Sequence, residues 1–152
     1  KTMTFEEIAA LPVGSLADQK SHLYLWTPNA LLPEALQIMK AWGFKYKTCG
    51  FAWINADATQ VEFLRDDIDP YMGLGYWTRA NSEVCLLATK GSPKRLNADV
   101  RQAIVEPKRQ HSRKPNIYDR IERLVAGPYI ELFARTRRPG WSSWGNETER
   151  FK

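Results

Sequence analysis

Residues 131–147 read Glu-Leu-Phe-Ala-Arg-Thr-Arg-Arg-Pro-Gly-Trp-Ser-Ser-Trp-Gly-Asn-Glu, and this stretch gives the clearest indication of the fold class. Its first residues continue an apolar run that begins at Tyr129, which predicts a buried strand. Pro139 and Gly140 predict a turn, and residues 141–144 predict a short return strand. Because open α/β sheets bind ligands at the carboxyl ends of their strands, we expect a ligand near this stretch.

The loop and the tip of this stretch carry polar side chains that suit a nucleotide-like ligand. Arg135, Arg137 and Arg138 offer donors to an anionic group. Asn146 and Glu147 offer the mixture of donors and acceptors that a ribose or an adenine edge requires. The pattern alone slightly favours a simpler alternative, a surface hairpin with solvated arginines.

The composition fits one globular domain, with 152 residues of which 43% are hydrophobic and 26% charged. No apolar run is long enough for a membrane span, and the N-terminal residues lack the apolar core of a signal peptide, so we expect a cytoplasmic protein. Cys49 and Cys85 each lie in an apolar run, which predicts buried free thiols rather than a disulfide. With His22 and His111 as the only histidines, no Cys/His cluster has metal-ligand spacing, and we expect no metal.

Positive charge is unevenly distributed along the chain. The formal net charge is +5 and the calculated pI is about 9.3. Between Lys90 and Arg138, lysine and arginine clearly outnumber aspartate and glutamate. A basic half beside a neutral half predicts a polyanionic partner, namely nucleic acid. The alternative is a charge that only keeps the surface soluble.

Apolar periodicity and breaker residues predict alternating strands and helices. The capping-box pattern Thr4-Phe-Glu-Glu7 predicts a short first helix. The expected strands cover residues 22–26, 44–54, 83–89, 103–106 and 129–134, and the longer expected helices cover 30–42 and 115–126. Residues 55–74 predict a long irregular loop. The alternation predicts an α/β fold whose sheet is mostly parallel, with helices on both faces.

Four stretches of the sequence, taken in order, resemble one family of proteins. They are His22-Leu-Tyr-Leu-Trp-Thr-Pro-Asn29, Gly73-Leu-Gly-Tyr-Trp-Thr-Arg-Ala-Asn-Ser-Glu83, His111-Ser-Arg-Lys-Pro115 and residues 131–147. Together they resemble the N6-adenine methyltransferases related to the catalytic subunit of eukaryotic messenger-RNA adenine methylation, and most closely the phage and bacterial DNA adenine methyltransferases. Each motif alone is weak, but their order and spacing extend the resemblance over nearly the whole chain.

The resemblance implies a fold, a cofactor and a reaction. The fold would be a single Rossmann-like methyltransferase domain over residues 1–152, with a permuted strand order. The reaction would move a methyl group from S-adenosylmethionine to the N6 amine of adenine in nucleic acid, in DNA rather than RNA. A homodimer or a partner subunit would fit the family. The alternative function is a non-catalytic nucleic-acid-binding homologue, or a partner subunit of such an enzyme.

The resemblance also implies roles for individual residues. Lys114 would meet the methionine carboxylate, and Glu131 would lie close to the cofactor. The ribose and adenine would lie against Arg135, Arg137, Asn146 and Glu147, the last of which is often Gln in the family. The substrate side would involve Tyr76, Trp77, Asn81, Glu83, His111 and Ser112. Simpler alternatives are core packing for the two aromatic residues, a solvated cap at the start of a strand for Glu83, a solvated or nucleic-acid-facing role for Arg137 and Arg138, and an inert loop histidine.

The family's catalytic signature, Asp-Pro-Pro followed by an aromatic residue, does not occur in residues 1–152. In the family its Asp side chain and a Pro carbonyl accept the hydrogens of the amine as the methyl approaches, which is positioning plus electrostatics. Residues 69–71, Asp-Pro-Tyr, are the nearest match, but their place in the long loop favours a plain loop. We expect the signature upstream of Lys1, in a segment this chain lacks, or else a truncated homologue with little or no methyl transfer.

Overall fold

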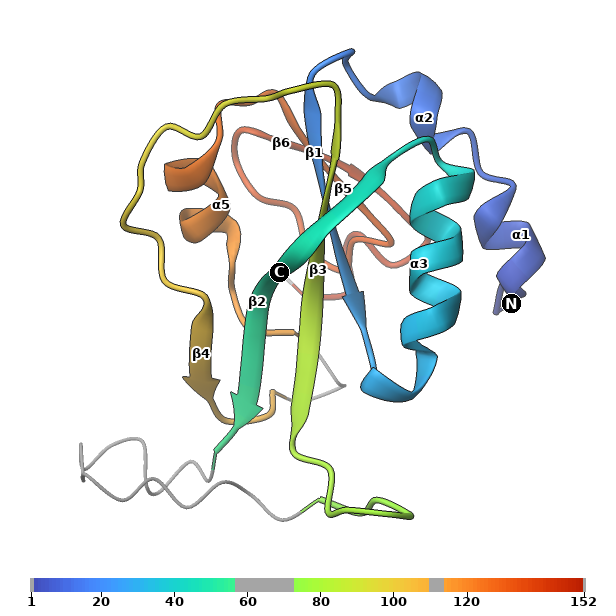
Figure 1. Cartoon of the computed structure of the whole chain (residues 1–152), viewed down its shortest axis with the longest axis vertical. Coiled ribbons are helices and arrows are strands. Elements are labelled where there is room, and N and C mark those ends of the chain that lie inside the picture. Colours follow the sequence, from blue (N-terminus) through green and yellow to red (C-terminus); the bar gives the residue numbers. More distant parts are fainter. Residues whose placement is uncertain (1, 57–72, 110–113, 152) are drawn as a thin grey trace.

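The computed structural model describes residues 2–56, 73–109 and 114–151, in which strands and helices form an α/β fold (Figure 1). The strands are β1 (Ser21–Thr27), β2 (Lys45–Asn55), β3 (Ser82–Lys90), β4 (Ala103–Glu106), β5 (Tyr129–Leu132) and β6 (Trp141–Trp144). The helices are α1 (Phe5–Ala9), α2 (Val13–Leu16), the 3-10 turn η1 (Asn29–Leu31), α3 (Leu32–Ala41) and α5 (Tyr118–Leu124). The predicted α/β class and the positions of the predicted strands are confirmed.

The four-stranded sheet has the order β1-β3-β2-β4, and it is partly antiparallel rather than mostly parallel as expected. β3 runs antiparallel to both β1 and β2, whereas β2 and β4 are parallel. The α3 crossover makes β1 and β2 parallel to each other, and β3 inserts between them in the opposite direction. Alternation in the sequence predicts strands but not the order in which they pair.

The second sheet corrects the predicted return strand. β5 and β6 pair in parallel, with Tyr129 opposite Trp141, so they do not form a hairpin. The predicted turn exists, because the Trp141 amide donates to the Arg138 carbonyl at 3.1 Å and Gly140 has φ +83°. The intervening residues 133–140 nevertheless carry the chain back to the start of β5 before β6 begins.

Helices cover both faces of the four-stranded sheet, as predicted. Figure 1 shows α1 and α3 on one side and α5 on the other. The central strand β3 serves both sides, because side chains alternate along a strand. Leu86 packs with Met39 of α3, whereas its neighbour Cys85 packs with Ile121 of α5. Buried apolar side chains on both faces therefore fix the sheet between its helices.

The starts of α1 and α5 can be compared with the starts predicted from the sequence. Thr4 and Glu7 form the predicted capping box at α1. α5 begins at Tyr118, later than the predicted start at Pro115, and the Asn116 side chain accepts a hydrogen bond from the Tyr118 amide at 3.0 Å. None of the helices in the described ranges is long and apolar enough to cross a membrane.

The two cysteines are free thiols, as predicted. Cys85 is fully buried in β3, and burial raises the pKa of its thiol. Cys49 in β2 is only partly buried. Cys85 is therefore a core residue as predicted, whereas the prediction of a buried thiol is wrong for Cys49.

Candidate functional site

A cavity of about 1260 Å³ lies between the two sheets. Its walls come from β1, from β5 and the residues after it, from α1, α2 and α3, from residues 114–118 at the start of α5, and from Ser92, Pro93 and Lys94 in the loop after β3. Small-molecule sites usually measure about 300–1,000 Å³, so the space exceeds what one cofactor would fill.

Two strand edges open onto this cavity. In the described part of the chain, β1 pairs only with β3, and β5 pairs only with β6. Every residue of β1 and of β5 lines the cavity. Each strand thus keeps one edge with unpaired backbone donors and acceptors facing shared space, and such edges are usually covered in a stable fold.

Lys114 stands at one wall of the cavity, where its charge is compensated. Its ammonium group forms a close ion pair with Glu83, at the start of β3, and both side chains are about one-third exposed. The ammonium also lies 5.9 Å from the ring centres of both Trp26 and Trp53, which form a T-shaped pair. The structure therefore brings the predicted cofactor residue Lys114 and the predicted substrate residue Glu83 into direct contact.

Glu131 extends from β5 into the same cavity and accepts a close hydrogen bond from the Tyr118 hydroxyl. Burial raises the pKa of the Glu131 carboxyl, although the bond from Tyr118 opposes this shift. Burial and the neighbouring carboxylate raise the pKa of Tyr118 to about 12. Tyr118 had no predicted role, and no motif pointed to it, since its partner lies 13 residues further along the chain.

Arg135 also lines the cavity, and it connects the cavity to the C-terminal tip. Its Nε lies 3.3 Å from a carboxylate oxygen of Glu147, whose other oxygen accepts a bond from Arg150 at 2.6 Å. Asn146 is exposed beside this ion-paired group. Arg137 points elsewhere: it pairs with Glu149, its side chain is 69% exposed, and it does not line the cavity.

None of the predicted substrate residues that the structure describes lines the cavity, although Glu83 contacts the cavity residue Lys114. Tyr76 and Trp77 are 93% and 91% exposed and contact each other edge to face, so the core-packing alternative for them is wrong. The Asn81 carbonyl accepts a bond from the Asn55 amide at 2.8 Å, which joins β2 to the segment before β3. His111, Ser112 and the Asp-Pro-Tyr triplet at 69–71 lie outside the described residues.

A polar and aromatic cluster fixes β6 and the preceding loop against α5. Arg138 binds Glu122 at 3.0 Å and packs over the Tyr118 ring at 5.0 Å. The Trp141 indole donates to Glu122 at 2.8 Å and stacks on Tyr129 at 4.8 Å. Arg138 therefore holds the site together, which distinguishes it from the neighbouring exposed Arg137.

The donor set of the cavity suits a zwitterionic nucleoside ligand. Lys114 offers a cation to a carboxylate, Glu131 offers an acceptor to hydroxyl or ammonium groups, and Arg135 offers donors near the tip. Across the described ranges, no group of three His, Cys, Asp or Glu residues could hold a metal ion. The arrangement favours holding and orienting an organic ligand.

Comparison with known proteins gives a consistent result. The MT-A70 family model matches residues 1–147. The Type II methyltransferase M.MunI of Mycoplasma sp is 30% identical over 150 residues, covering 96% of this chain and 58% of that protein. The N(6)-adenosine-methyltransferase MT-A70-like protein of Drosophila melanogaster is 31% identical over 97% of this chain and 24% of that protein.

A third relative is less similar in sequence. The N6-methyladenosine RNA methyltransferase MTA1 of Cryphonectria parasitica is 24% identical over 97% of this chain and 43% of that protein. The chain thus spans a quarter to little more than half of the length of these relatives. The resemblance found in the four sequence stretches is confirmed, and the chain belongs to the MT-A70 family of N6-adenine methyltransferases.

Proposed function

We propose that the chain provides the cofactor-binding and substrate-facing part of an S-adenosylmethionine-dependent enzyme that methylates the N6 amine of adenine in DNA. The observation that carries the proposal is the convergence of Lys114, ahead of α5, with Glu131 and Arg135, in β5 and the loop after it, on one cavity. The cofactor supplies an electrophilic methyl group on a sulfonium. The residues of this chain bind and orient it rather than take part in bond making.

Lys114 would hold the methionine carboxylate, a role that its compact charge suits. Glu131 would accept from ribose hydroxyls, as an acidic residue does in other nucleotide-binding sheets. Arg135, with Asn146 and Glu147 at the adjoining tip, would close over the ribose and adenine. Because Lys114 already pairs with Glu83, a bound carboxylate would compete with or share that contact.

We further propose that a strand carrying the Asp-Pro-Pro-aromatic signature completes the enzyme by lying between β1 and β5. Two free edges facing one oversized cavity support this placement, since a strand there would pair with both. The signature would then accept the amine hydrogens of adenine beside the cofactor. A base in a duplex must leave its stack to reach such a site.

We propose DNA rather than RNA because of M.MunI. This chain covers a larger share of the length of M.MunI than of the other two relatives named. The alternative is a non-catalytic nucleic-acid-binding homologue or partner subunit, which would work without an Asp-Pro-Pro-aromatic segment. The residue composition of the cavity is the same under both, so activity must separate them. We place either form in the cytoplasm, where free thiols are the normal state.

Replacing Lys114 tests the cofactor site. We expect Lys114→Ala to weaken S-adenosylmethionine binding about 10- to 100-fold, because a hydrogen bond to a charged group contributes about 1.5–3 kcal/mol. Isothermal titration measures the affinity, and tritium transfer to matched DNA and RNA oligonucleotides measures activity and preference. Lys40→Ala, on the exposed side of α3, is the matched control. Equal affinity in both variants would remove the cofactor assignment.

A further inference from the structure

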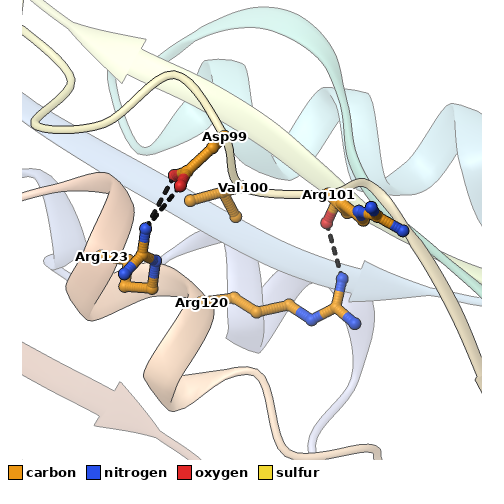
Figure 2. A pocket seen from close by; sticks show the side chains of 5 residues that line it. All are labelled: Asp99, Val100, Arg101, Arg120 and Arg123. Carbon is orange, nitrogen blue, oxygen red and sulfur yellow. Dashed lines mark hydrogen bonds and ion pairs between the residues drawn. The ribbon is translucent and has the colours of Figure 1, made fainter.

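The loop between β3 and β4, residues 91–102, has no regular secondary structure, yet it is fastened to α5 along its length. The Leu96 amide donates to the Leu124 carbonyl at 2.8 Å, and the Asn97 side chain donates to the Arg123 carbonyl at 2.6 Å. Figure 2 shows the next contact, in which Arg123 grips both oxygens of Asp99 at 2.7 and 2.8 Å.

Arg120 fastens the last part of the same loop. Its guanidinium donates to the backbone oxygens of Arg101 at 2.7 Å and Ala103 at 3.2 Å. The contacts run in order from the end of α5 to its middle, so the loop lies antiparallel along the helix. Hydrogen bonding of irregular backbone to side chains in this way fixes its conformation.

The fastened loop presents basic side chains outward. Lys94, Arg95 and Arg101 are exposed, and within the described ranges none of them has an ion pair or a side-chain hydrogen bond. Of the three, Arg101 lines a hollow of about 200 Å³ together with Asp99, Val100, Arg120 and Arg123 (Figure 2). Because Asp99 is already matched by Arg123, the remaining charge of this surface is positive.

We propose that the loop surface formed by Lys94, Arg95 and Arg101 binds the phosphate backbone of the nucleic-acid substrate. Lys94 and Arg95 directly precede the contact of Leu96 with the end of α5, whereas the Arg101 backbone contacts Arg120 in its first half. Cations at two places along the helix suit a chain of phosphates better than a single anion. Lys94 also lines the large cavity, so a backbone on this surface reaches the place where a base would enter. The proposal rests on the proposed function only for the choice of nucleic acid as the polyanion.

A triple substitution tests the surface. The variant Lys94→Gln/Arg95→Gln/Arg101→Gln removes three exposed charges and leaves the contacts that fasten the loop in place. Anisotropy of a labelled adenine-containing single-stranded oligonucleotide is measured between about 50 and 200 mM salt. Each lost phosphate contact reduces the slope of log affinity against log salt by about 0.7, so the slope should fall by about 2. At about 0.1 M salt the affinity should fall roughly 100-fold.

A matched control variant distinguishes binding by this loop surface from binding by the net charge of the whole protein. It removes the same number of exposed lysines from α3 and β2, as Lys40→Gln/Lys45→Gln/Lys47→Gln. We expect its salt slope to stay within a few tenths of that of the unchanged protein. An equal loss in both triple variants would overturn the proposal, because net charge alone would then explain binding.

Two further measurements distinguish a failure of this proposal from a failure of the proposed function. S-adenosylmethionine affinity should be the same in the loop variant and the unchanged protein, since the loop variant keeps Lys114, Glu131 and Arg135. Loss of oligonucleotide binding with cofactor binding retained supports the surface alone. Polyglutamate that competes as strongly as the oligonucleotide would overturn the choice of nucleic acid and indicate an acidic protein partner.

Discussion

At the scale of single residues, Glu131 combines a proposed contact with the cofactor and a cost in stability. Burial raises the pKa of its carboxyl, so the folded protein binds this proton more tightly than the unfolded chain does. The stabilisation from protonation is present below the ordinary glutamate pKa of about 4.3 and is lost as the pH rises through the raised value. At neutral pH the partly buried, charged carboxylate of Glu131 therefore lowers the stability of the folded protein, and we expect a bound ligand to offset this cost.

Glu131→Gln should separate stability from function. The amide keeps an oxygen for the Tyr118 hydroxyl but has no charge to desolvate, so the melting temperature at pH 7 should equal or exceed that of the unchanged protein. The difference should shrink as the pH falls below the ordinary glutamate pKa, and cofactor affinity should drop about tenfold or more. Thermal unfolding at several pH values and titration calorimetry measure both effects. A variant less stable at pH 7 with unchanged affinity would contradict this account.

The sequence predicted which residues line the cavity better than it predicted which residues they contact. Lys114 and Glu131 were predicted at the cofactor, and both line the cavity. Tyr118 and the Trp26–Trp53 pair were not, because their roles arise from contacts across 13 or more positions of the chain. The ion pair between Lys114 and Glu83 joins two predicted residues whose meeting no local pattern could have shown.

At the scale of elements, we predict that the backbone amides on the unpaired edge of β1 exchange quickly with solvent. In an antiparallel pair, alternate residues point their backbone groups toward the partner strand, so the others in β1 point toward the cavity. Native-state hydrogen exchange should therefore show fast and slow amides alternating along residues 21–27. In a form that carries the Asp-Pro-Pro segment, the fast amides should slow at least about tenfold. Uniform protection of β1 in the 152-residue chain would contradict the free edge.

The elements also show what local sequence can and cannot specify. The capping box at Thr4 and the apolar runs of β1 and β3 predicted their elements correctly, because these signals act within a few residues. The direction of β6 was predicted wrongly, since a turn at Gly140 does not specify which strand edge the following residues will find. Pairing is settled by packing, here by Trp141 against Tyr129 and α5.

At the scale of the whole molecule, one cavity connects the two sheets, the segment before α5 and the basic loop. The α/β class and the helices on both faces were predictable from the alternation of elements. The cavity was not, because it depends on how β5 is placed beside the free edge of β1. We propose that S-adenosylmethionine binds in this cavity.

The most direct test is to titrate S-adenosylmethionine into the 152-residue chain and follow the backbone amide signals by NMR, which also detects weak binding. We predict saturable shifts that are largest at Lys114, Glu131 and Arg135, with β4, which does not line the cavity, unaffected, and their loss in Lys114→Ala. No shifts at millimolar cofactor, or shifts centred away from the cavity, would contradict the account.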